Sequence, residues 1–196
     1  MREMIKMIVV LTFLSSLSGG LLAAVRNGTK ERIETQELTF VKGPAILKIL
    51  DGASNDPVND RFKLDDNGVE RSFFVGIFDG NPKVVSFETA SIGYGDMIGL
   101  MVGINVDEDK IVSISVTTHK ETPGLGAKAK SDPGFGGQFQ GMTVDTPIKV
   151  NNDGGDINAI SGATITSRAV CVAATDACDI YLRMKTQIKD KLKSFK

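Results

Sequence analysis

Hydroxyl and small side chains gather in one short stretch, residues 161–167, just before a long helical pattern. The stretch reads Ser-Gly-Ala-Thr-Ile-Thr-Ser. Thr164, Thr166 and Ser167 are residue types that cap helices, and Gly162 allows a ligand to approach the backbone closely. A helix start also gathers unpaired N–H groups and the positive end of the helix dipole. The stretch therefore predicts either a plain capped helix or a site for an anion, phosphate in particular.

A second stretch of unusual composition, residues 119–128, reads His-Lys-Glu-Thr-Pro-Gly-Leu-Gly-Ala-Lys. One proline and two nearby glycines predict a loop whose backbone adopts angles that most residues avoid. Taken alone, this pattern indicates a turn and no particular chemistry.

Together the two stretches resemble the signatures of one flavin-binding family. Ser-Gly-Ala-Thr followed by Ile-Thr-Ser resembles the flavin-attachment motif of the G subunit of the Rnf electron-transport complex, shared by the C subunit of the Na⁺-translocating NADH:quinone oxidoreductase. Glu-Thr-Pro-Gly-Leu-Gly resembles the other signature of that family. The resemblance runs from about Phe73 to Val170 and includes Gly-Tyr-Gly around Tyr94 and the segment Phe135–Phe139.

This resemblance implies a covalent cofactor and assigns roles to several residues. In the family, the last Thr of the attachment motif carries FMN through a phosphoester bond, which corresponds to Thr164 here. Glu121 and Thr122 are then expected to form hydrogen bonds with the FMN, with Leu125 as an apolar wall near its ring. The cofactor-binding residues that the resemblance implies are Ser161, Gly162, Ala163, Thr164, Thr166, Glu121, Thr122, Gly124, Leu125 and Tyr94.

The implied function is that of a membrane-anchored electron-carrier subunit in an ion-translocating ferredoxin:NAD oxidoreductase complex. Such a subunit does not turn over alone, and its expected partners are the other membrane subunits of the Rnf complex and a flavin transferase that attaches the FMN. One position departs from the family pattern. An Asp commonly stands three residues before the Ser of the attachment motif and contributes to recognition by the transferase, whereas this chain has Asn158, with Asp156 two residues earlier. Asn can keep similar local hydrogen bonds but loses the charge.

The N-terminus contains an uncharged run, Met7 to Val25, about 19 residues long, which at about 1.5 Å per residue nearly spans the hydrocarbon core of a bilayer. A cleaved signal peptide is the competing interpretation, because Arg2 and Lys6 precede the apolar residues and the small residues Ala23 and Ala24 stand near their end. A retained anchor is favoured, since a signal core is only about 7–15 residues long and Leu-Ala-Ala at residues 22–24 is not a clean cleavage site.

Basic residues stand on both sides of this run, so their distribution does not set its orientation. Arg2 and Lys6 precede it, and Arg26, Lys30 and Arg32 follow it. The signal-like shape and the resemblance favour a cytoplasmic N-terminus and a flavin domain on the extracytoplasmic side of the cell membrane, with lipid around residues 7–25.

The region after the anchor is expected to contain helix first and sheet second. We predict a short exposed helix over residues 27–37, followed by an interruption at Gly43-Pro44. One or two turns of buried helix over residues 45–50, ended by Asp51-Gly52, should come next. Residues 53–68 are then expected to form a turn-rich connection. Apolar residues then recur with a period of two. Residues 73–78 and 84–89 flank the turn Asp79–Pro82, and residues 98–106 and 112–116 form a second, half-buried hairpin whose polar face is water-facing or covered by something other than core.

A helix with one buried face follows from Arg168 to Lys196. The apolar residues at spacings of three and four are Val172, Ala173, Ala177, Ile180, Tyr181, Met184, Ile188 and Leu192. The fold class is therefore α+β: a single N-terminal transmembrane helix, then an antiparallel-sheet FMN-binding domain with a long C-terminal helix. The expected division is an anchor over 1–25, a membrane-proximal region over 26–70 and the FMN-binding domain over 71–196.

Composition and residue counts disfavour several other functions. A formal charge of −1 gives no reason to expect nucleic-acid binding, since the surfaces that bind nucleic acid are strongly basic. A metal centre is not expected, because His119 is the single His and Cys171 and Cys178 are the two Cys. These two Cys lie seven positions apart on one helix, about 10.5 Å along its axis, which is too far for a disulfide, so we interpret them as core residues. No Gly-x-Ser-x-Gly motif accompanies His119, which disfavours serine hydrolysis.

Three alternatives to this function stay open from the sequence. The chain could be a membrane-anchored binding or scaffold module without flavin, an extracytoplasmic oxidoreductase with noncovalent flavin, or a C-type subunit of the Na⁺-translocating NADH:quinone oxidoreductase.

Overall fold

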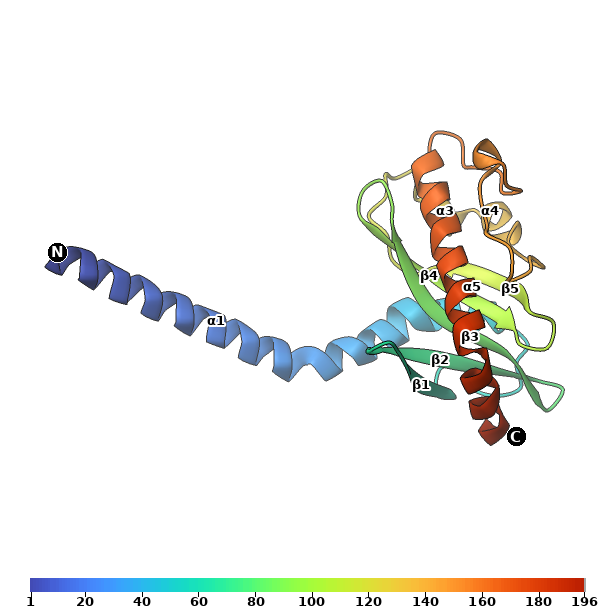
Figure 1. Ribbon diagram of the computed structural model, residues 1–196, viewed down its shortest axis with the longest axis horizontal. Helices are drawn as coiled ribbons and strands as arrows, with labels where there is room; N and C mark the ends of the chain where they lie inside the picture. The colour runs from blue at the N-terminus through green and yellow to red at the C-terminus, as the bar shows by residue number, and fades with distance from the viewer. Residues whose placement is uncertain (196) are drawn as a thin grey trace. The chain divides into compact units, whose positions relative to one another are not determined.

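The computed structural model describes residues 1–195, except for the side chain of Glu31, and divides into two compact units, Met1–Phe40 and the part from Val41 onward (Figure 1). The end of the predicted C-terminal helix at Lys196 lies outside the described residues. The first unit consists mainly of helix α1, Arg2–Gln36. Within α1 the stretch Arg2–Lys30 is long and apolar enough to cross a membrane.

The helical start of the chain is less interrupted than its sequence indicates. The helix expected over residues 27–37 is the last part of α1 and not a separate element. A π-helical turn, η1 (Glu37–Lys42), follows, and α2 (Gly43–Ile49) comes next. The interruption predicted at Gly43-Pro44 is wrong, because Lys42 keeps helical angles of φ −84° and ψ −37°. Pro44 stands in the first turn of α2, where a missing N–H removes no hydrogen bond of that helix.

The second unit contains one five-stranded antiparallel sheet with strands in sequence order (Figure 1). Its strands are β1 (Arg61–Asp66), β2 (Val69–Phe78), β3 (Asn81–Ile92), β4 (Met97–Asn105) and β5 (Lys110–Val116). Both predicted hairpins are present. Asp79 and Gly80 connect β2 to β3 with positive φ angles of 52° and 74°, which are the angles of the turn that joins antiparallel strands most tightly.

Strand β1 falls inside residues 53–68, for which we predicted only a turn-rich connection. It pairs with β2 along its whole length, and Phe62 stacks on Phe73 with ring centroids 5.4 Å apart. The prediction was wrong because β1 is an edge strand whose sequence, Arg-Phe-Lys-Leu-Asp-Asp, is mostly charged. Its two apolar residues are too few for a clear period.

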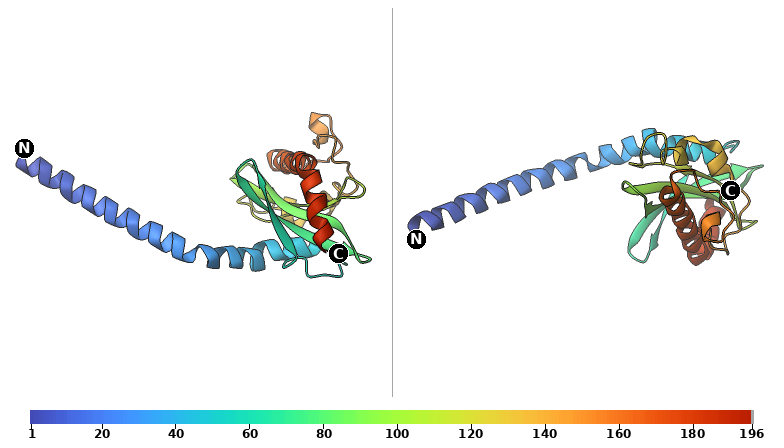
Figure 2. Two further views of the ribbon diagram at one scale, coloured as in Figure 1. Left: turned by 60° about the horizontal axis from the view of Figure 1, so that its bottom comes forward. Right: turned by 90° about the horizontal axis from the view of Figure 1, so that it is seen from above.

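The sheet is covered on both faces (Figure 2). Helix α5 (Thr164–Leu192) lies on one face, where Thr89 of β3 donates a 2.8 Å hydrogen bond to the carbonyl of Ala173. On the other face α2 packs so closely that a Cβ on Gly103 would lie 2.2 Å from Ile49. The face of the second hairpin that we expected to be polar is therefore covered by α2, and β4 is buried on both sides between Ile98 and Ile104.

Helix α5 begins at Thr164, earlier than the predicted Arg168, and continues after Leu192 as the 3₁₀ turn η3 (Lys193–Phe195). Its buried stripe matches the prediction at seven positions, but Val172 is exposed. Val172 lies on the opposite side of the helix from a stripe that runs through Val170, Ala173 and Ala177.

Polar contacts fix the second half of α5 to the sheet. Arg183 and Arg71 both bind the buried carboxylate of Asp66, each at 2.8 Å, which links α5 to β1 and β2. Near the β4–β5 turn, the buried hydroxyl of Tyr181 donates a 2.7 Å hydrogen bond to Asp109. These contacts set the position of α5 along its own axis.

The segment between β5 and α5 contains three short helices, α3 (Lys128–Ser131), α4 (Pro133–Gly137) and the 3₁₀ turn η2 (Asn151–Asp153). Phe135 and Phe139 anchor it in the core, edge to face with centroids 5.7 Å apart. This segment brings the chain back to the end of the sheet where α5 starts.

Candidate functional site

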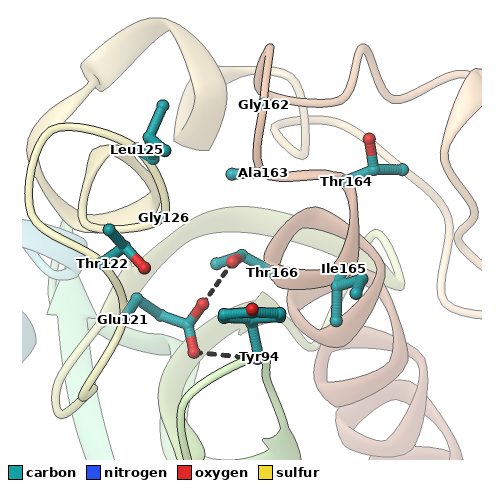
Figure 3. Close-up of a pocket in the computed structure, with 10 residues that line it drawn as sticks. All are labelled: Tyr94, Glu121, Thr122, Leu125, Gly126, Gly162, Ala163, Thr164, Ile165 and Thr166. Carbon is teal, nitrogen blue, oxygen red and sulfur yellow. Dashed lines mark hydrogen bonds between the residues drawn. The ribbon is translucent and has the colours of Figure 1, made fainter.

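A cavity of about 500 Å³ opens where three segments meet at the start of α5 (Figure 3). The segments are the β3–β4 turn, the loop after β5 and the stretch that leads into α5. Its lining combines apolar side chains, hydroxyl side chains, two glycines and one carboxylate. The lining residues are Tyr94, Glu121, Thr122, Leu125, Gly126, Gly162, Ala163, Thr164, Ile165 and Thr166.

The carboxylate of Glu121 joins these segments from inside the cavity wall. One oxygen accepts hydrogen bonds from the backbone N–H groups of Tyr94 and Gly95, each 3.0 Å long, which fixes the β3–β4 turn. The other oxygen accepts a short hydrogen bond from the hydroxyl of Thr166 in the first turn of α5 (Figure 3). Glu121 is 5% exposed, so both walls are held by a buried group.

These hydrogen bonds determine the charge of Glu121. Burial alone would raise its pKa, but the hydrogen bonds from Thr166, Gly95 and Tyr94, with His119 nearby, outweigh that effect and lower the pKa below its ordinary value. Glu121 is therefore an anion at neutral pH.

Glycines make room for this carboxylate. A Cβ on Gly93 would lie 2.5 Å from one oxygen of Glu121, and a Cβ on Gly126 would lie 2.8 Å from both the other oxygen and the hydroxyl of Thr166. Gly95 is equally restricted, because its Cβ would lie 2.3 Å from the carbonyl oxygen of Lys120. Any side chain at these positions would displace the wall of the cavity.

The first turn of α5 has no side-chain cap, which corrects our expectation that Thr164, Thr166 and Ser167 supply one. Ala163 is the N-cap residue, and the structure gives no side-chain hydrogen bond to the helix start. The hydroxyl of Thr166 binds Glu121 instead, and that of Ser167 donates to the carbonyl of Ala163 and accepts from the N–H of Ile160. Both hydroxyls lie after the N-cap position in the sequence, and they form hydrogen bonds with other residues instead of capping the helix.

Thr164 differs from its neighbours in exposure and in hydrogen bonding. Thr166 and Ser167 are buried, at 1% and 0% exposure, whereas Thr164 is partly exposed and lines the cavity. In the described part of the chain its hydroxyl has no hydrogen-bond partner, and neither do the backbone N–H groups of Thr164, Ile165 and Thr166. A free hydroxyl therefore stands beside free N–H donors at the positive end of a 29-residue helix.

Comparison with known proteins identifies the family. Residues 93–179, which include the whole cavity lining, match the FMN-binding domain family. The chain is 33% identical over 184 residues to the G subunit of the ion-translocating oxidoreductase complex of Methanosarcina acetivorans, a match that covers 91% of this chain and 94% of that one. The chain belongs to the family of G subunits of ion-translocating oxidoreductase complexes. The family that the two motifs resemble is thereby confirmed, with FMN as the cofactor of the matched domain.

Two further matches agree with this G-subunit family. The G subunit of the proton-translocating ferredoxin:NAD(+) oxidoreductase complex of Clostridium ljungdahlii is 42% identical over 91 residues, covering 45% of this chain and 48% of that one. The crystal structure of the C subunit of Na(+)-translocating NADH-quinone reductase from Parabacteroides distasonis has a TM-score of 0.52 and 26% identity, covering 60% of this chain and 63% of that one. The predicted α+β fold, an N-terminal apolar helix with an antiparallel sheet and a long C-terminal helix, is confirmed.

The cavity of this family member brings together eight of the ten residues that the motifs assigned to the cofactor. Ser161 and Gly124 do not line it. Gly124 has a φ of +76° and shapes the loop, and Ser161 is exposed. The motifs missed Gly126 and Ile165, although both stand inside the two signature stretches. The signal for Gly126 was its glycine identity beside a turn, and that for Ile165 was an apolar residue among hydroxyls at a helix start.

Asn158, three residues before Ser161, lies in a network of amide side chains outside the cavity lining. Its side-chain oxygen accepts a 2.7 Å hydrogen bond from Asn151, and its side-chain nitrogen donates a 3.0 Å hydrogen bond to Gln138. The backbone N–H of Asn158 donates to the same Gln138 oxygen at 2.7 Å. The hydrogen bonds that we expected an Asn to keep are therefore made within the chain.

The remaining candidate residues have structural roles. Cys171 and Cys178 are buried in the core as expected, and burial raises the pKa of both thiols to about 12. The ring of His119 accepts a 3.3 Å hydrogen bond from the N–H of Glu121, which places it in the loop behind the cavity. Among the described residues there is no group of three or more His, Cys, Asp and Glu side chains that could hold a metal ion.

Proposed function

We propose that this chain holds FMN in the cavity through a phosphoester bond to Thr164 and carries electrons within an ion-translocating oxidoreductase complex of the Rnf type. One observation supports this attachment site: Thr164 is the residue of the helix start whose hydroxyl is partly exposed and has no partner among the described residues, at the edge of the cavity. The neighbouring hydroxyls of Thr166 and Ser167 are buried and already hydrogen-bonded.

The cavity suits a flavin mononucleotide in size and chemistry. Its volume of about 500 Å³ lies within the range of about 300–1,000 Å³ that small-molecule sites occupy. Tyr94, Leu125 and Ile165 are 70%, 44% and 49% exposed and offer apolar surface for a flat ring. Leu125 packs against Gly162, since a Cβ added to Gly162 would lie 3.1 Å from the Leu125 side chain. The apolar surface proposed for the ring therefore extends to the residues just before Thr164.

The start of α5 suits the phosphate. A phosphodiester at Thr164 keeps one negative charge, and the free N–H groups of residues 164–166 and the helix dipole stabilise an anion there. Among the described residues no base forms a hydrogen bond with the hydroxyl of Thr164, so a separate flavin transferase is needed. That enzyme would supply an activated flavin phosphate whose leaving group departs as the Thr164 oxygen bonds to phosphorus, and it would take up the hydroxyl proton. FMN supplies the electron chemistry when bound, and the side chains of the cavity position it and exclude water.

Membership of the G-subunit family and the apolar stretch of α1 make this chain a membrane-anchored subunit of an oxidoreductase complex. Its partners are other subunits of that complex. We propose further that α1 is a retained anchor with a cytoplasmic N-terminus, that the flavin domain over residues 71–196 lies on the extracytoplasmic side, and that residues 26–70 connect the two. Covalent attachment keeps the cofactor where free FMN is dilute.

The alternatives receive less support. A scaffold without flavin does not account for the match of residues 93–179 to an FMN-binding domain. A C-type subunit is less favoured, because the match to the Methanosarcina acetivorans protein covers 94% of that protein at 33% identity, whereas the match to the Parabacteroides distasonis structure covers 63% of that chain at 26% identity. A noncovalent flavin would leave the hydroxyl of Thr164 unused.

In-gel flavin fluorescence tests the proposal. The full chain is expressed with a flavin transferase and run on a denaturing gel as wild type, Thr164→Ala and Ser161→Ala. Ser161 is an exposed hydroxyl in the same stretch that does not line the cavity. We expect fluorescent wild-type and Ser161→Ala bands and a dark Thr164→Ala band. A fluorescent Thr164→Ala band would move the attachment site, and a dark wild-type band would remove covalent flavin from the function.

A further inference from the structure

Glu121 combines three properties in one side chain: it is ionised, it is buried, and it lines the cavity. We propose that Glu121 acts as a fixed negative charge in the cavity wall that lowers the reduction potential of the flavin held there. This inference rests on the function proposed above. It gives Glu121 a role distinct from direct hydrogen bonding to FMN.

The hydrogen bonds around Glu121 hold its charge in place. Three donors converge on the carboxylate, two of them backbone N–H groups of the β3–β4 turn and the third the hydroxyl of Thr166. Each oxygen is therefore bound by the protein itself, and the carboxylate cannot turn toward solvent without breaking contacts to both walls (Figure 3).

No Lys or Arg side chain forms an ion pair with this carboxylate within the described part of the chain. Glu121 forms no ion pair there, and the adjacent Lys120 binds Asp96 instead. His119, two residues earlier, accepts a hydrogen bond through its ring nitrogen from the N–H of Glu121 and forms no ion pair with the carboxylate in the described structure. The donors around the carboxylate are dipoles, so a net negative charge remains at the wall.

Glycines keep the region around the carboxylate closed. The positions that face its two oxygens are Gly93 and Gly126, where a Cβ would lie 2.5 Å and 2.8 Å away. The backbone therefore packs directly on the carboxylate and leaves little room for water. Because charges interact more strongly where water is excluded, a neighbouring group in the cavity experiences this charge with little screening.

An electron added to the flavin places additional negative charge in the cavity unless a proton follows it. Repulsion from Glu121 disfavours that added charge and leaves the oxidised flavin unaffected. The flavin is then harder to reduce than it would be beside a neutral side chain. Glu121 thus acts on the reduction potential of the cofactor through space, and its hydrogen bonds keep the carboxylate ionised and fixed in position.

The midpoint potential of the attached flavin, measured by spectroelectrochemical titration of the purified full chain in detergent, tests the inference. Glu121→Gln keeps the shape and can keep the hydrogen bonds, because its amide oxygen accepts from the turn and the hydroxyl of Thr166 can accept from its amide nitrogen. We expect a shift to a higher potential. Asp96→Asn is the matched control, since it removes an exposed carboxylate from the same turn and should shift the potential much less.

Thr166→Val supplies a second variant with the opposite expected sign. It removes one donor and leaves the carboxylate less compensated, so the potential should fall. No shift in Glu121→Gln, a shift no larger than that of Asp96→Asn, or a rise in Thr166→Val would overturn the inference. Failure of both Glu121→Gln and Thr166→Val to take up flavin would make Glu121 purely structural and overturn it as well. Absence of flavin from the wild type would instead reject the proposed function.

Discussion

The hydroxyl of Thr166 donates a hydrogen bond to Glu121 across 45 positions of sequence, whereas the hydroxyl of Thr164, two residues earlier, has no protein partner in the described structure. Adjacent members of one motif are therefore used differently. Thr166 faces inward and holds the walls of the cavity together, and Thr164 is left free at its edge. The hydrogen bond between Thr166 and Glu121 leads to predictions about the stability and the flavin content of several variants.

Thr166→Val should lower the stability of the domain. Valine has the same shape but cannot donate to Glu121, so the buried carboxylate loses one of its three donors. Loss of a hydrogen bond to a charged group costs about 1.5–3 kcal/mol. Urea unfolding should show a decrease of about 2 kcal/mol, with Thr122→Val, an exposed cavity residue, close to wild type. Equal losses in both variants would contradict the role of the buried hydrogen bond.

Gly126→Ala should disturb the cavity and reduce the flavin attachment that we propose at Thr164. The added Cβ would lie 2.8 Å from the Cβ and one oxygen of Glu121 and from the hydroxyl of Thr166, so this contact must open. We expect lower in-gel fluorescence per molecule and a lower melting temperature. Gly137→Ala is the control, because a Cβ there meets nothing within 4 Å. Equal flavin content in the two variants would show that the loop moves freely.

The lowered pKa of Glu121 should make the stability of the domain fall with acidification. Burial alone would raise this pKa, but the hydrogen bonds from Thr166, Gly95 and Tyr94 lower it in the folded state. The folded carboxylate therefore binds a proton less readily than the unfolded one. Its contribution is fully present above the ordinary carboxyl pKa and is lost as pH falls through the folded pKa.

Urea unfolding followed from neutral pH into the acid range measures this contribution. Asp66 and Asp109 also have lowered pKa values and add to the slope of the wild type. The difference between the wild type and Glu121→Gln isolates Glu121. We expect the wild-type curve to fall more steeply with decreasing pH, and parallel curves would contradict the assignment.

The two thiols should be unreactive in the folded chain. Cys171 and Cys178 are 2% and 1% exposed, and burial raises the pKa of each to about 12, so the thiolate is scarce at neutral pH. A maleimide reagent should label neither in native protein and both in urea, which mass spectrometry can count. Rapid labelling of the native chain would mean that the first half of α5 opens frequently.

Local sequence patterns predicted the elements whose signals are strong within a short window. Asp79-Gly80 between two alternating runs predicted the β2–β3 hairpin, and the spacing of Tyr181, Met184 and Ile188 predicted the buried side of α5. Most of the cavity lining followed from short motifs that resemble those of a known family, although Gly126 and Ile165 were missed. Both kinds of prediction depend on residues close together in the chain.

The predictions from sequence were wrong where contacts between residues far apart in the chain determine the local structure. Strand β1 exists because Phe62 stacks on Phe73 and Asp66 binds Arg183, and neither contact is visible within the strand itself. Ser167 could cap a helix by its type, but its hydroxyl instead binds the N–H of Ile160. The strand that we expected over residues 112–116 begins earlier, at Lys110, because the register shifts between Gly103 and Ile104 and Ile111 is buried as the partner of Ile104.

The anchoring of α5 by Arg183 and Tyr181 has a consequence for its opposite end. A helix behaves as a stiff rod that advances about 1.5 Å per residue, so sliding it by one residue would carry Thr164 the same distance past the cavity mouth. The ion pair of Arg183 with Asp66 and the hydrogen bond of Tyr181 with Asp109 fix the second half of α5 to the sheet and prevent such sliding. The position of the Thr164 hydroxyl, which we propose as the attachment site, is thus set by ion pairs and hydrogen bonds several helical turns away. Substitutions of Arg183 or Tyr181 can therefore displace this hydroxyl, although neither residue lines the cavity.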